Sequence, residues 1–205
     1  MKLTWLGHSC FLVEQDGYRI VLDPYRDVAG HADIRTEAHE VLCSHGHYDH
    51  SAVDGVTLLP EQKSPFVIRT VQTCHDEQGG ALRGENTVHI LEAGGVSVAH
   101  LGDLGHLLSA EQIEAIGPLD AVMIPVGGFY TIDGETAKAV CEALKPRIII
   151  PMHYRHAPHG LSAVAGVEPF LQLWAEDEIH TLSGNTLEVA ADKAGVWVPT
   201  YVKPK

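Results

Sequence analysis

The sequence predicts an α+β fold in a single domain that spans residues 1–205. Short runs rich in β-branched and other apolar residues fill the first half of the chain, and amphipathic helical patterns begin only near residue 109. No repeat, low-complexity tract or linker interrupts the sequence. Its 205 residues suit one domain, because domains typically contain about 50–250 residues.

The predicted strands are joined by recognisable turns. Residues 15–17 form a tight turn between two strands, and residues 92–95 divide the long run at 87–103 in two. The apolar run within residues 147–154 is typical of a central strand with both faces buried. The other strands are expected at residues 2–7, 9–15, 18–24, 40–45, 65–72 and 120–128, and a C-terminal hairpin at 178–183 and 185–190.

Three helices are expected in the second half of the chain. The first spans residues 109–117, where Ser109 and Gln112 have the spacing of a capping box. The second spans residues 133–146 and can be capped by Asp133. Its apolar residues follow the i, i+3, i+4, i+7 spacing of a buried face: Ala137, Val140, Cys141 and Leu144. The third is expected at residues 166–176.

Composition excludes several classes of protein. Fourteen Lys and Arg against 27 Asp and Glu give a net charge of −13, which argues against a nucleic-acid-binding surface. No apolar run reaches the roughly 18–20 residues of a membrane span, and no secretory signal is visible at the start. The four cysteines lack CxxC spacing, so we expect reduced thiols in a cytoplasmic protein. The oligomeric state is left open, and a homo-oligomer is allowed.

Histidine is unusually frequent, with 14 residues, and it is concentrated in one short segment. His45, His47, Asp49 and His50 follow a predicted strand. Residues two apart in an extended chain point the same way, so His45 and His47 can bind one ion. Asp49 and His50 lie where the chain must turn, and they can face a second ion. The alternative to metal binding is a solvent-exposed, histidine-rich loop.

Three further candidate ligands stand at predicted strand ends. They are His75, Asp103 and His153. One site would then contain His45, His47 and His75, and the other Asp49, His50 and His153, with Asp103 bridging both ions. For each of these three, the alternative is an ordinary core or surface residue.

Such a ligand set predicts catalysis rather than a structural metal. Imidazole and carboxylate suit Zn²⁺, Mn²⁺ or Fe²⁺, and we expect zinc first. Three protein ligands per ion leave a position open for water. Two ions roughly 3.5–4 Å apart can share a hydroxide that acts as nucleophile.

The HxHxDH motif at residues 45–50, the lone His75, Asp103 after Leu-Gly, and the late His153 together resemble the metallo-β-lactamase superfamily. More narrowly, LGHSCFLVE, HLGDLGHLLS, PVGGFYTID and IIIPMHY are similar to the ascorbate-6-phosphate-lactonase-like branch. The resemblance implies an αββα sandwich of two mixed sheets flanked by helices, with metals at one edge. It also implies the ligand assignments given above. For Asp23 it implies a buried aspartate that supports the loop of candidate ligands, and the alternative for this residue is a simple turn aspartate before Pro24.

Two departures narrow the expected function. Penicillin-cleaving relatives usually lack a bridging aspartate, so Asp103 argues against that activity. The nuclease branch carries a large inserted domain, for which 205 residues leave no room.

We therefore expect a metal-dependent hydrolase in which a metal-bound hydroxide attacks an ester, lactone or phosphodiester bond of a small-molecule substrate. Asp49 is expected to orient the nucleophile, and His8 and Tyr130 are candidates for proton transfer or for holding a substrate oxygen. A structural histidine and a core-packed tyrosine are their alternatives. The alternative function is a di-iron redox or sensing protein of the same fold, and a noncatalytic binding protein is a weaker third.

Overall fold

The N-terminal strands bury side chains on both of their faces. Successive side chains of a strand point to opposite faces. Leu3 and Phe11 face the larger of two hydrophobic clusters, whereas Cys10 and Val21 face the smaller one. The computed structural model, which describes residues 1–203, places these strands in a mixed five-stranded sheet. Its order is β13 (Thr186–Glu188), β1 (Lys2–Gly7), β2 (Cys10–Gln15), β3 (Tyr18–Leu22) and β5 (Glu40–Leu42).

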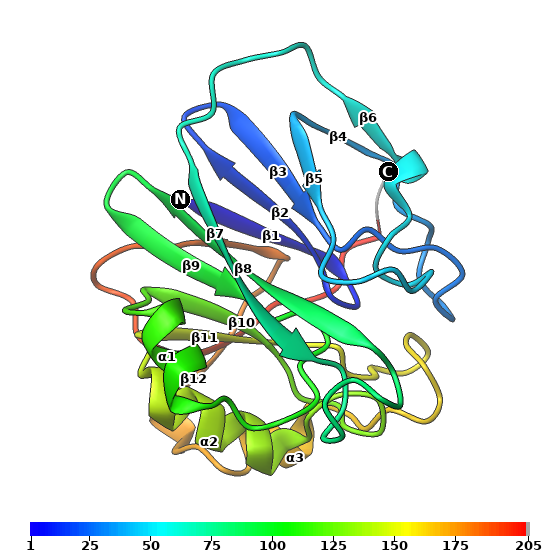
Figure 1. Ribbon diagram of the computed structural model, residues 1–205, viewed down its shortest axis with the longest axis vertical. Coiled ribbons are helices and arrows are strands. Elements are labelled where there is room, and N and C mark those ends of the chain that lie inside the picture. The colour runs from blue at the N-terminus through cyan, green and yellow to red at the C-terminus, as the bar shows by residue number, and fades with distance from the viewer. Residues whose placement is uncertain (204–205) are drawn as a thin grey trace.

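A second mixed sheet of seven strands packs against the first (Figure 1). The antiparallel strands β7, β8 and β9 form one side of it, and the parallel strands β10, β11, β14 and β12 form the other. Its order is β12 (Ile179–Thr181), β14 (Gly195–Val198), β11 (Ile148–Met152), β10 (Ala121–Pro125), β9 (Val96–His100), β8 (Glu85–Ala93) and β7 (Val67–Cys74).

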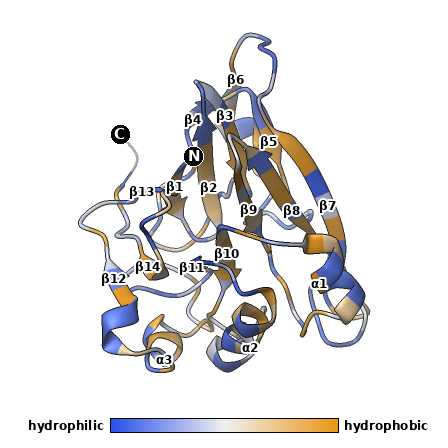
Figure 2. Cartoon of the chain, turned by 90° about the vertical axis from the view of Figure 1, so that its left-hand side faces the viewer, coloured by the Kyte–Doolittle hydropathy of each residue, from blue (hydrophilic) through white to orange (hydrophobic). Residues whose placement is uncertain are grey.

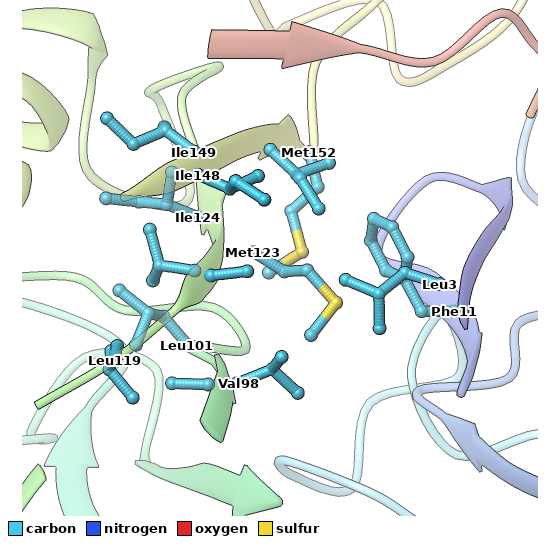
Figure 3. Packing of buried hydrophobic residues seen from close by; sticks show 14 of the residues in the cluster. Leu3, Phe11, Val98, Leu101, Leu119, Met123, Ile124, Ile148, Ile149 and Met152 are labelled. Carbon is cyan, nitrogen blue, oxygen red and sulfur yellow. The ribbon is translucent and has the colours of Figure 1, made fainter. Parts of the chain in front are cut away.

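The main core lies between the two sheets. Figure 3 shows Met123 and Met152 facing Leu3 and Phe11 of the opposite sheet. All four side chains are at most 1% exposed. Since burial of a large apolar side chain stabilises a fold by about 1.5–3 kcal/mol, this layer holds the two sheets together.

The helices cover the outer face of the seven-stranded sheet, where Figure 2 shows α1 and α2 with mixed hydropathy beneath hydrophobic strands. Helix α1 (Ala110–Ile116) begins with the predicted capping box, and α2 (Gly134–Leu144) is capped by Asp133 as predicted. Two short strands, β4 (Thr36–Ala38) and β6 (Val56–Leu58), with their loops cover the other sheet. The α+β sandwich of two mixed sheets is confirmed.

Two local expectations are wrong. Strands β12 and β13 do not form a hairpin, because β12 pairs with β14 and β13 pairs with β1 of the other sheet. The third helix, α3 (Glu168–Leu171), is shorter than the expected span 166–176. The short 3₁₀ helices lie at Val53–Gly55 and Glu176–Glu178.

The direction of the strands brings the predicted site residues to one edge of the sandwich. Strands β1, β3 and β5 run the same way in one sheet, and β7, β9, β10 and β11 run the same way in the other. The loops after these strands carry the predicted site residues. Within residues 1–203, no helix has the length and apolar character required to cross a bilayer.

Candidate metal centre

Buried Asp23, directly after β3, organises the histidine-rich loop. Its Oδ1 accepts a hydrogen bond from the Ser44 amide at 2.6 Å, and its Oδ2 accepts one from the Ser44 hydroxyl at 2.6 Å. The same Oδ2 lies 2.7 Å from His50 Nδ1. A carboxylate in this position favours a proton on Nδ1, so that His50 Nε2 is free to bind a metal.

Asp103, in the loop after β9, lies at the centre of four imidazoles. Its Oδ2 is 3.1 Å from His75 Nε2, 3.4 Å from His153 Nε2 and 3.9 Å from His45 Nε2. Its Oδ1 is 3.2 Å from His50 Nε2. Two oxygens therefore face histidines that come from both sheets. This is the arrangement that a carboxylate shared between two ions requires.

The candidate ligands form two groups, as the spacing of the motif predicts. The ligand atoms of His45, His47 and His75 lie within 4.8 Å of one another. A second group with the same spacing contains Asp49, His50 and His153, and it also includes His8. Ligand atoms of Asp23, His45 and His50 also lie within 4.8 Å of one another. We discount Asp23 as a ligand, because hydrogen bonds already engage both of its oxygens.

The donor set fits divalent metal ions. Buried polar atoms normally have hydrogen-bond partners. Within the described chain, the Nε2 atoms of His8, His45, His50 and His153 are buried without one, as is Asp103 Oδ1. Nitrogen and oxygen donors of this kind suit zinc, manganese or iron. The ligand roles of the seven predicted residues stay predictions, and the structure brings all seven together at one edge.

The electrostatics of the cluster favour bound cations. Burial lowers the pKa of His45 to about 3, and the positive charge of His50 adds to the effect. Burial would raise the pKa of Asp103, but the charges of His153 and His50 outweigh it and hold the pKa well below its ordinary value. Burial would lower the pKa of His50, but Asp103 and Asp23 raise it well above its ordinary value. The raised pKa means that His50 holds a second proton, and a metal ion can replace the one on Nε2, which faces Asp103.

His8 is buried behind the ligands and does not line the pocket. Its Nε2 lies 3.3 Å from Asp49 Oδ2, and its carbonyl accepts a hydrogen bond from Trp5 Nε1 at 2.9 Å. Burial and the charge of His153 lower its pKa to about 4. His8 and His153 both adopt positive φ, at 49° and 51°, and the His153 amide donates to the His8 carbonyl. Strained backbone of this kind is common at functional sites.

Several residues outside the predicted ligand set support the candidate ligands. Asn86 Oδ1 accepts a hydrogen bond from the Asp103 amide at 2.9 Å, and its Nδ2 donates to the Leu101 carbonyl. Gly102 adopts φ +56°, and a Cβ there would lie 2.3 Å from Asn86 Oδ1. His106 Nε2 accepts from the Cys74 amide next to His75. Asn86 lies on β8, next to the strand that leads into the Asp103 loop, and an asparagine within a strand is the one signal that the sequence offered.

A pocket of about 300 Å³ opens over the candidate ligands. Tyr130 lines it together with Asp49 and Asp103, and its expected contact with the substrate stays a prediction. Tyr48 is half-exposed and lines the same pocket. Arg83, which sequence reasoning overlooked, also lines it. Arg155, close in sequence to His153, is exposed and lies outside it.

Comparisons with known proteins agree with this geometry. A family model described as a beta-lactamase superfamily domain matches residues 2–153. The chain is 29% identical over 197 residues to a UPF0173 metal-dependent hydrolase of Carboxydothermus hydrogenoformans, covering 77% of this chain and 86% of the relative. It is 31% identical over 179 residues to a UPF0173 protein of Pyrococcus furiosus, covering 75% and 83%. A crystal structure from Thermotoga maritima, of a protein assigned as a Zn-dependent hydrolase of the metallo-beta-lactamase superfamily, has a TM-score of 0.75 at 35% identity and covers 97% of each chain.

Proposed function

The chain belongs to the beta-lactamase superfamily, among the UPF0173 metal-dependent hydrolases, and we propose that it uses two divalent metal ions to hydrolyse an ester, lactone or phosphodiester bond. The superfamily predicted from the sequence is thereby confirmed. The narrower likeness to ascorbate-6-phosphate lactonases stays a prediction. We expect zinc, in line with the description of the Thermotoga maritima protein.

One observation carries the proposal of a dinuclear site. Four imidazole Nε2 atoms lie 3.1–3.9 Å from the two oxygens of Asp103. A single ion would need only one such group of ligands. Two groups with a carboxylate between them support a pair of ions, which these residues would hold beside the pocket.

The chemistry that two divalent ions supply when bound is activation of a water molecule and polarisation of the substrate oxygen. The protein residues have three tasks around that chemistry. His45, His47 and His75 hold one side of the centre, and His50, His153 and Asp49 hold the other. Asp103 places a negatively charged carboxylate between these two groups of ligands. Asp23 fixes the ring of His50 through its Nδ1 atom.

Tyr130 is the candidate for contact with the substrate. Its side chain lines the pocket beside Asp49 and Asp103 and is 36% exposed. Its hydroxyl can donate a hydrogen bond to a substrate oxygen. His8 acts through Asp49, whose carboxylate it orients by the 3.3 Å contact. We therefore place His8 as a positioning residue and Tyr130 as a substrate-binding residue.

The test is a measurement of bound metal followed by a screen of lactones, phosphodiesters and thioesters. His47→Ala should abolish both metal retention and turnover, because it removes one ligand of the first group. His180→Ala is the matched control, since His180 packs on Trp197 and not on any candidate ligand. A His47→Ala variant with full activity, or a metal-free protein as fast as the loaded one, would contradict the proposal.

Metal identity separates the proposal from its alternative. Colourless zinc or manganese with turnover supports hydrolysis. Bound iron with a visible absorption spectrum, together with no hydrolysis, would support a redox or sensing protein instead.

A further inference from the structure

Arg83 lies on a wall shared by two neighbouring pockets. It lines the pocket over the candidate ligands and also a second pocket of about 320 Å³. Tyr130 is the other residue common to both. A substrate that extends from the candidate ligands into the second pocket must therefore pass these two side chains.

Hydrogen bonds fix both the backbone and the side chain of Arg83. Its amide donates a 2.7 Å hydrogen bond to Asp76 Oδ2, and Asp76 also accepts the amides of Gln78, Gly80 and Leu82 at 2.8–3.0 Å. Its guanidinium donates to the Phe129 carbonyl at 3.1 Å and lies 5.8 Å from the centre of the Tyr130 ring. These contacts pre-organise the side chain for binding, which reduces the entropic cost of holding a ligand.

The charge of Arg83 is available to a ligand. Four other arginines pair with a carboxylate within 3.4 Å: Arg19, Arg26, Arg69 and Arg147. Arg83 forms no such ion pair with any carboxylate in residues 1–203. Of the residues described as lining the two pockets, it is also the only lysine or arginine.

Four of the five carboxylates that line the two pockets have other partners; the fifth, Glu77 in the second pocket, forms no ion pair with Arg83. Asp76 accepts four backbone amides, and Asp133 caps α2 through the Thr136 amide. Asp49 and Asp103 face the candidate ligands. The guanidinium is therefore an unpaired positive charge beside the proposed reaction site, and it presents several N–H donors in a planar fork that fits a carboxylate or a phosphate.

We propose that Arg83 determines substrate specificity, by binding an anionic group of the substrate, a carboxylate or a phosphate, next to the bond that is cleaved. The inference rests on the proposed hydrolase function. It names the substrate class as esters or lactones that carry a second, negatively charged group. That group would sit at the boundary of the two pockets, with the remainder of the molecule in the second pocket.

The test compares two esters that differ in one terminal group. 4-Nitrophenyl hexanoate is neutral, and mono-4-nitrophenyl adipate carries a carboxylate at the end of an acyl chain of the same carbon number. Arg83→Gln should raise KM for the adipate ester about 10–100-fold, with little change in kcat, and should change KM for the hexanoate ester less than about twofold. Arg83→Lys should recover part of the loss. Arg19→Gln, on the exposed end of an ion pair with Glu14, is the matched control.

A binding measurement separates this inference from the proposed function. Calorimetric titration of the metal-loaded protein with phenyl phosphate and with benzoate should show tighter binding to wild type than to Arg83→Gln. The ligand with the larger difference distinguishes phosphate from carboxylate. If wild type hydrolyses neither ester, the proposed hydrolysis of esters is contradicted. The titration still shows whether Arg83 binds an anionic group. Equal binding of both ligands by wild type and Arg83→Gln, or equal KM changes for the two esters, would overturn the inference.

Discussion

Replacing Asp23 by Asn tests whether this buried carboxylate controls the histidine cluster. The carboxylate of Asp23 only accepts hydrogen bonds, so His50 must carry its proton on Nδ1. An asparagine whose oxygen stays at the Oδ1 position keeps the hydrogen bond from the Ser44 amide, and its NH₂ group then takes the Oδ2 position, where it faces His50 and the Ser44 hydroxyl. His50 would have to accept at Nδ1, and its proton would move to Nε2. That proton would occupy the atom that points to Asp103.

Two magnitudes follow from these contacts. Loss of a supporting partner of a metal-binding histidine weakens metal affinity about 10–100-fold, or by about 1.4–2.7 kcal/mol. Loss of the charged acceptor should lower the free energy of unfolding of the metal-free protein by about 1.5–3 kcal/mol, because Asp23 is fully buried. The side-chain volume barely changes, so packing makes only a small contribution.

The assay is competition for zinc with a coloured chelator, together with urea unfolding of the metal-free protein. Asp54→Asn is the control, since Asp54 forms only an exposed ion pair with Arg26. Nitrogen-15 NMR of the histidines reports the tautomer of His50 directly. If Asp23→Asn binds zinc as tightly as wild type, or if His50 keeps its proton on Nδ1, the reasoning is refuted.

Asn86→Ala should lower the free energy of unfolding by about 2–4 kcal/mol in urea titrations, because the buried amide binds the loop that carries Asp103; a loss below about 0.5 kcal/mol would contradict this. Met123→Ala should cost about 2–5 kcal/mol and Met123→Leu less than about 1.5 kcal/mol, and equal losses would argue against the packing shown. Burial would raise the pKa of Asp120, but the Ser97 amide and Arg147 outweigh it and lower the pKa. Its stabilisation is therefore present above about pH 4 and is lost on acidification, so the stability difference between wild type and Asp120→Asn should shrink below about pH 4; a constant difference would exclude this linkage.

Local pattern was sufficient to predict most of the strands, but not the short strands β4, β6 and β14, and it also indicated the cluster of candidate ligands. The alternation in residues 2–7 and the capping box at Ser109 are local signals, and both elements form as expected. His75, Asp103 and His153 were predicted to converge because each follows a strand. Parallel strands bring their C-terminal ends to one edge, so strand order alone places these residues together.

Other features depend on contacts between distant parts of the chain. Adjacent strands β12 and β13 have the pattern of a hairpin, but each finds a better partner in a different sheet. Arg83 acquires its position from Asp76 and Phe129, and the latter is 46 residues away. Asn86 is one of two asparagines in the sequence, and its role depends on its hydrogen bonds to Leu101 and Asp103 and on the close approach of Gly102, all of them on the next strand and its loop. No spacing rule within the sequence encodes such relations.

The hydrogen bond from the His153 amide to the His8 carbonyl joins the rims of the two sheets, and the candidate ligands are drawn from both rims. Neither sheet alone supplies the full set of candidate ligands. If the proposed metal ions bind there, their binding would follow the docking of the two sheets. Bound ions would link the loops of the two sheets. Removal of the ions should therefore loosen these loops first, while the core around Met123 and Met152 stays packed.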